Sequence, residues 1–138
     1  MKESQIKAIL TVLGGAVIYF LGGWDVALRA LMIFMVLDYA TGVIRAWYQK
    51  QLNSYVGFRG IVKKVALLVV VAVAAQIDLV TGDTGAARSV AIMFLAANEG
   101  LSILENLAGM DVPIPPAVKV ALASWKAQDE PPKDGEKA

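Results

Sequence analysis

The 138-residue sequence contains no cysteine and no histidine, and its 13 basic and 12 acidic side chains leave a net charge of only +1. The chain therefore lacks the usual soft and imidazole metal ligands, a thiol nucleophile and the commonest general base. We expect no catalytic residues, no metal site and no bound cofactor. A net charge so close to zero also gives no overall field that would collect nucleic acid or an acidic substrate.

What the sequence has in excess is hydrophobic residues, which make up 57% of the chain, above the 45–50% or so of an average soluble domain. This excess predicts a small all-α integral membrane protein. Four hydrophobic segments lie at residues 6–22, 26–46, 61–80 and 88–107. The favoured arrangement is a bundle of four hydrophobic helices. The alternative is three spans, with residues 88–107 lying along the membrane interface because that segment becomes amphipathic toward its end.

In the first segment, Lys2 and Lys7 lie ahead of the apolar core, as in a signal peptide. No small-x-small cleavage site follows it, so we expect a retained span. Its 17 residues cover about 25 Å of a hydrocarbon core that is about 30 Å thick.

Basic residues cluster around the connection between the second and third segments, and basic residues near span ends resist translocation. The cluster consists of Arg45, Lys50, Arg59, Lys63 and Lys64. We therefore expect this connection to be cytoplasmic, with the two adjacent lysines extending toward the interface. The N-terminus is then cytoplasmic. The C-terminus is cytoplasmic with four spans and external with three.

The aromatic side chains of this basic connection also occur beside basic residues in nucleic-acid-binding proteins. Next to a span they are the usual interfacial anchors, so no nucleic-acid partner is expected. Residues 1–122 are expected to form the membrane domain. Residues 123–138, rich in charge and containing Pro131 and Pro132, are expected to form a disordered tail because they cannot bury a core.

The second segment carries a polar stripe. Asp38, Thr41, Gly42 and Arg45 are spaced by three, four or seven residues and share one helix face. A charge near mid-membrane costs about 2.5 to 3.5 kcal/mol, so Asp38 needs a basic partner or water. Two interpretations stay open: pairing with Arg45 or Arg29 that only holds helices together, or a position lining a pore.

The end of the fourth segment carries a second polar face. Its members occupy an arc of about 120° at 100° per residue, and they are Asn98, Glu99, Ser102, Glu105 and Asn106. Leucine and isoleucine side chains lie outside this arc. The face indicates either a helix end emerging among lipid headgroups or a surface that meets a partner or a lumen.

Four blocks resemble the phage holin family that includes the toxin-secretion and phage-lysis holins. They are LDYATG at 37–42, SYVGFRGIVKK at 54–64, NEGLSILEN at 98–106 and PIP at 113–115. The resemblance covers roughly residues 8 to 122, and the third block is its most specific part. Tyr55 departs from the family pattern, which often has lysine there. So does the Asp111-Val112 pair, where many members have small residues.

The resemblance implies a protein that accumulates in the bacterial cytoplasmic membrane, forms homo-oligomers and permeabilises the bilayer. A cell-wall hydrolase, the endolysin, would then reach the peptidoglycan without binding the protein directly. The family usually has about three spans. The candidate pore or oligomer-interface residues are Asp38, Arg45, Asn98, Glu99, Ser102, Glu105 and Asn106. The alternative classes are a small transporter or channel subunit, and a scaffold that recruits a partner through its tail.

Overall fold

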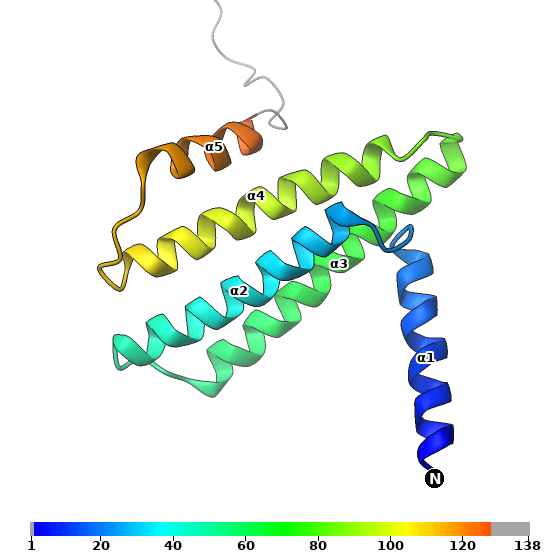
Figure 1. Ribbon diagram of the computed structural model, residues 1–138, viewed down its shortest axis with the longest axis horizontal. Coiled ribbons are helices and arrows are strands. Elements are labelled where there is room, and N and C mark those ends of the chain that lie inside the picture. Colours follow the sequence, from blue (N-terminus) through cyan, green and yellow to red (C-terminus); the bar gives the residue numbers. More distant parts are fainter. Residues whose placement is uncertain (1, 128–138) are drawn as a thin grey trace, which may run out of the picture.

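The computed structural model describes residues 2–127, which form five helices joined by short connections (Figure 1). The helices are α1 (Glu3–Phe20), α2 (Val26–Tyr48), α3 (Ser54–Thr81), α4 (Ala86–Ala108) and α5 (Pro116–Ala127). The predicted all-α fold is confirmed, since the described part of the chain contains no strand. Each of the four predicted hydrophobic segments corresponds to one of the helices α1 to α4.

Helices α2, α3 and α4 lie side by side, and α4 packs against both of the others (Figure 1). Helices α2 and α3 contact each other far less, although only a short loop joins them. The core between them is formed by Leu28, Leu31, Met35, Val71, Ile92 and Leu95, with small residues at Ala74, Ala75, Ala96 and Ala97. Small side chains let helices approach closely, which is the main source of packing energy inside a membrane.

Three helices of the described chain are long and apolar enough to cross a membrane, and these are α2, α3 and α4. The fourth predicted segment is therefore among the candidate spans, and the alternative expectation, which placed it along the membrane interface, is not supported. Helix α1, expected as the first span, is not among them. The number of candidate spans thus matches the alternative expectation of three. That expectation, however, placed the spans in α1, α2 and α3, whereas the candidate spans are α2, α3 and α4.

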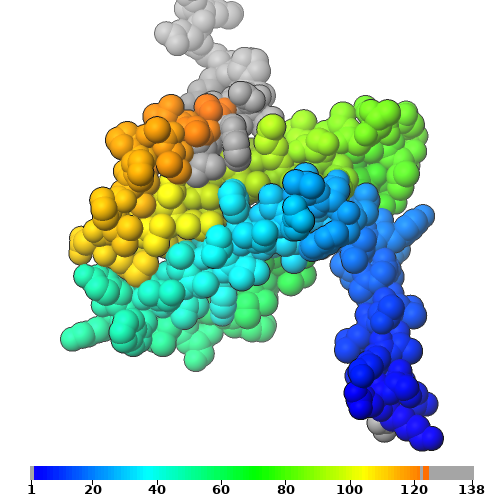
Figure 2. Space-filling model, viewed as in Figure 1, coloured from blue at the N-terminus to red at the C-terminus, as the bar shows by residue number. Residues whose placement is uncertain are grey.

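Helix α1 projects away from the bundle (Figures 1 and 2) and has no buried residue. It contacts the bundle only through α3. The chain turns between α1 and α2 at Gly22 and Gly23, whose φ angles of 81° and 99° favour glycine.

Helix α5 packs along α4 (Figure 1) and was not expected. It extends to Ala127, so residues 123–127 are helical and do not belong to a disordered tail. Residues 128–138 of the expected tail lie outside the described residues.

A carboxylate fixes the connection between α3 and α4 by accepting backbone hydrogen bonds. The N-cap residue of α4 is Gly85, which has no side chain to cap the helix. The carboxylate of Asp78, buried near the end of α3, instead accepts hydrogen bonds from the backbone N–H groups of Ala87 and Arg88, both at 2.9 Å. A negative charge is favourable at a helix N-terminus. The Asp78 carboxylate therefore pairs with otherwise free backbone N–H groups at the start of α4 and orients this end of the helix.

Candidate functional site

A cluster of three charged side chains joins the three apolar helices. Lys64 of α3 lies between Asp38 of α2 and Glu99 of α4, and its ammonium group contacts one carboxylate oxygen of each. The side chains of Lys64 and Asp38 are 14% exposed and that of Glu99 is 6% exposed. One cation between two carboxylates leaves a formal charge of −1 within the bundle. We call these three residues the charged cluster.

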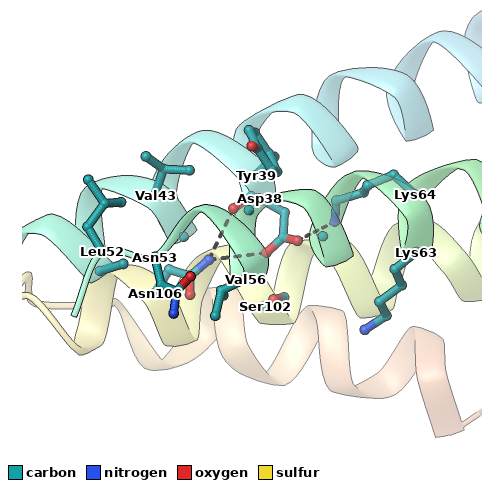
Figure 3. A pocket seen from close by; sticks show the side chains of 14 residues that line it. Asp38, Tyr39, Val43, Leu52, Asn53, Val56, Lys63, Lys64, Ser102 and Asn106 are labelled. Atoms are coloured by element: carbon teal, nitrogen blue, oxygen red, sulfur yellow. Dashed lines mark hydrogen bonds and ion pairs between the residues drawn. The ribbon is translucent and has the colours of Figure 1, made fainter.

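An amide side chain completes the coordination of Asp38. The Nδ2 atom of Asn106 lies 3.1 Å from the Oδ1 atom of Asp38, 3.2 Å from its backbone oxygen and 3.1 Å from the Thr41 hydroxyl (Figure 3). Gly42 lies beside this amide, since a Cβ atom there would be at an ordinary contact distance of 3.5 Å from Nδ2. Both carboxylate oxygens of Asp38 are thus paired, one with Asn106 and one with Lys64.

The structure corrects the expected partner of Asp38. Arg45 lies two turns away, about 10.5 Å along the helix axis, and its guanidinium instead donates to the backbone oxygen of Glu105 at 3.5 Å. Arg29 is exposed and makes no ion pair within residues 2–127. Lys64 was expected to extend toward the membrane interface, but it turns into the bundle because two carboxylates meet there.

The polar face of α4 is divided between two environments. Glu99 is buried in the charged cluster, Asn98, Ser102 and Asn106 are half-buried, and Glu105 is exposed. Glu99 and Asn106 therefore serve contacts within the monomer. The carboxylate of Glu105 forms no ion pair with any described residue.

Two cavities lie on either side of the charged cluster. One of about 350 Å³ includes Asp38 and Lys64 in its wall, and the other of about 400 Å³ includes Glu99 and Glu105. Lys63 and Ser102 line both cavities. Each cavity is large enough to hold several water molecules. Charged groups that face such spaces can exchange protein partners for water.

A second ion pair holds the opposite end of the bundle. The guanidinium of Arg88 contacts the Asp25 carboxylate at 2.6 Å and donates to the backbone oxygens of Leu21 at 2.5 Å and Gly23 at 3.0 Å. The hydrogen bond from Arg88 lowers the pKa of Asp25, while partial burial opposes the shift. This ion pair was not expected from the sequence, where Arg88 marks only the start of a hydrophobic segment.

The chemistry of the charged cluster is that of an ion-pair network. Within residues 2–127 no group of three or more acidic side chains is placed to hold a metal ion. The cation shared by Asp38 and Glu99 is the Lys64 side chain itself. The cluster can hold three helices together. The helices can separate if its charged side chains exchange one another for other partners.

The sequence profile of the bacteriophage holin family matches residues 15–127. An uncharacterized 14.9 kDa protein in the nagH 3' region of Clostridium perfringens is 44% identical over 120 residues, covering 86% of this chain and 91% of that protein. The uncharacterized protein YqxH of Bacillus subtilis is 34% identical over 134 residues, covering 97% and 95%. A probable holin of Bacillus phage phi105 is 40% identical over 91 residues, covering 66% and 67%. No solved structure matches the chain.

Proposed function

This chain belongs to the bacteriophage holin family, and we propose on that basis that it accumulates in the cytoplasmic membrane of a bacterial host, forms homo-oligomers and permeabilises the bilayer. The endolysin then passes to the peptidoglycan and the host lyses. The three apolar helices make the chain a multi-pass membrane protein. The observation that carries the proposal is the charged cluster. Ionisable groups at this depth are costly and are usually functional.

The charged cluster supports a two-state account of permeabilisation. In the monomer, Lys64 pairs with Asp38 and Glu99, so these three charges are not left facing lipid. In an oligomer, the same polar side chains can line a water-filled lesion, where water replaces their partners. The equilibrium between the two arrangements shifts as subunits associate, because only the second one uses contacts between copies.

The membrane topology is part of the proposal. A cytoplasmic position for the loop between α2 and α3 is supported by Lys50 in the loop and by Arg59, Lys63 and Lys64 in the first half of α3. The C-terminal end of α4 lies at the same end of the bundle, since the hydroxyl of Tyr48 contacts the Asp111 carboxylate at 3.3 Å. With α2, α3 and α4 as spans, the C-terminus is therefore cytoplasmic. A cytoplasmic N-terminus requires α1, about 27 Å long, to cross as well.

Protease digestion of spheroplasts checks this topology. We expect epitope tags inserted after Lys50 or after Ala138 to resist added protease in intact spheroplasts and to be cut after permeabilisation. A tag inserted after Asp83, in the α3–α4 loop, is the control and should be cut in both. Cleavage of the C-terminal tag in intact spheroplasts would contradict the placement of α4 as a span.

Inducible co-expression with a cytoplasmic endolysin tests the function itself. We expect abrupt lysis only when both proteins are made, with loss of membrane potential preceding it. The controls are each protein alone, and the endolysin with a catalytically inactive substitution. Continued growth with an intact membrane potential would refute the holin assignment.

A small channel or transporter subunit is the second candidate, because the two cavities beside the charged cluster would also suit a path for solutes. Such a protein would pass small ions but retain the endolysin. Release of small dyes without a cytoplasmic enzyme of endolysin size would therefore favour the channel.

A further inference from the structure

The buried arginine at the start of α4 bonds to the end of another helix. Arg88 lies in the first turn of α4, where a positive charge is unfavourable, and only 8% of the residue is exposed. The four hydrogen bonds that its guanidinium forms within the described chain all go to residues 21–25, which join α1 to α2. The position of this side chain is therefore explained by the α1–α2 connection and not by α4.

The acceptors of Arg88 belong to both sides of that connection. Leu21 is the C-cap of α1, and Gly23 follows in the turn. The last carbonyl groups of a helix lack partners within it and carry partial negative charge, so a guanidinium there is favourable. Asp25 is the N-cap of α2 and also accepts from the backbone N–H of Leu28 at 2.9 Å. We call the contacts of Arg88 with residues 21–25 the α1 latch.

The other contacts between α1 and the bundle are few. No residue of α1 is buried, and the helix touches only α3. The side chain of Leu21 lies in the core and anchors the end of α1 at one point. Gln76 of α3 donates to the backbone oxygen of Phe20 at 3.5 Å, a long hydrogen bond. One anchored side chain and one long hydrogen bond do not fix the direction of a helix, so this role falls to Arg88.

The backbone and the space beside the turn allow α1 to change direction. Gly22 and Gly23 both have positive φ angles and, lacking a Cβ atom, can adopt other conformations at little cost. A cavity of about 420 Å³ lies beside them, and its wall includes Tyr19 of α1 and Leu79 of α3. None of the large side chains of the core lines this cavity. Helix α1 can therefore tilt toward it without disturbing the packing of α2, α3 and α4.

We propose that the α1 latch sets the direction of α1 relative to the bundle, and that α1 reorients about Gly22 and Gly23 when the latch opens. On opening, the guanidinium exchanges the Leu21 and Gly23 oxygens for water, which reaches the site because the Asp25 side chain is 49% exposed. Every residue of α1 is exposed on the monomer, so the direction of α1 decides what this helix meets. The latch does not depend on the proposed lytic activity.

A distance measurement between two spin labels on the full chain in lipid nanodiscs tests the latch. The labels are attached to Leu10→Cys on α1 and Val73→Cys on α3, because both positions are exposed and the native chain has no cysteine. An excess of unlabelled chain restricts the signal to distances within one subunit. We expect a single narrow distance distribution with the latch intact. Arg88→Gln should about double its width, because α1 then samples several directions.

The matched control is Arg29→Gln, the same substitution at an exposed arginine of α2 that forms no ion pair within residues 2–127. It should leave the width unchanged. Asp25→Asn separates the ion pair from the N-cap, since asparagine caps a helix about as well as aspartate. We expect Asp25→Asn to broaden the distribution less than Arg88→Gln, because the bonds to the two carbonyl oxygens remain.

A pair of glycine variants tests the latch without changing any charge. A Cβ atom at Gly22 would lie 2.7 Å from Nε of Arg88, whereas one at Gly23 would meet nothing within 4 Å. Both positions have positive φ, so alanine strains the backbone at either one. Gly22→Ala also displaces the guanidinium, and it should therefore broaden the distribution more than Gly23→Ala does.

Circular dichroism shows whether each variant keeps its helices, and the glycine pair carries the test if Arg88→Gln does not fold. An unchanged width in Arg88→Gln, or equal broadening in Arg88→Gln and Arg29→Gln, would overturn the latch and show that contact with α3 sets the direction of α1. A broad distribution in the chain with an intact latch would also overturn it. No lysis is measured, so failure here is separable from failure of the proposed function.

Discussion

Replacing Lys64 by methionine is expected to lower the free energy of unfolding of the helical bundle by about 3 to 5 kcal/mol, the usual cost of leaving a buried charge without its partner. Methionine keeps the length of the side chain but removes the cation. Asp38 and Glu99 would then face each other as two largely buried carboxylates without a cation between them, and Asp38 would keep only its hydrogen bond from Asn106.

Reversible unfolding in mixed detergent micelles, followed by helicity, measures the loss. Lys63→Met is the matched control, since it makes the same change one residue away on an exposed side chain, and we expect a much smaller effect. A triple variant that adds Asp38→Asn and Glu99→Gln should recover most of the stability, because the buried carboxylates are then neutral. Equal losses in Lys64→Met and Lys63→Met would mean that the charged cluster does not hold the helices together.

The helices α1 to α4 were predictable because each contains a long apolar run bounded by polar or glycine residues. The run from Val65 to Ala75 and the basic residues before it predict α3 without any tertiary information. The amphipathic end of α4 was also predictable from the rotation of about 100° per residue in a helix. These are local properties of single helices, and the structure agrees with them.

The partners of the charged residues were not predictable, because periodicity within one helix shows a face but not the helix that it meets. One of the two open interpretations paired Asp38 with a basic residue of its own helix, where Arg45 is too distant. Its partner Lys64 belongs to the next helix. Glu99 and Glu105 were grouped in one arc of α4, yet they lie at its two edges, and only Glu99 reaches the interior.

Helix α5 was missed although its start carries a recognisable signal. Pro116 is its first residue, and proline is well suited to the first turn of a helix because its missing N–H is not needed there. The prolines before it, at positions 113 and 115, were considered only as part of the PIP block that resembles the holin family. Its 12 residues span about 18 Å, too short to register as a membrane helix.

Cysteine labelling is expected to show that the outer polar face of α4 changes its surroundings when lysis is triggered. This face consists of Asn98, Ser102 and Glu105. Glu105 is exposed on the monomer without an ionic partner among the described residues. Placing a carboxylate against lipid is unfavourable in free energy. We therefore expect contacts with other subunits to cover this face before triggering and water to reach it afterwards.

The native chain has no cysteine, so single cysteines at positions 98, 102 and 105 can be labelled in membranes with a charged thiol reagent. Labelling should rise several-fold after triggering, because water enters the lesion that the polar face lines. Leu104→Cys is the control, since this position lies outside the polar arc and should stay poorly labelled throughout. Equal labelling of all four positions at both times would identify the end of α4 as an interfacial helix terminus, and the lesion would then have to be lined by the charged cluster alone.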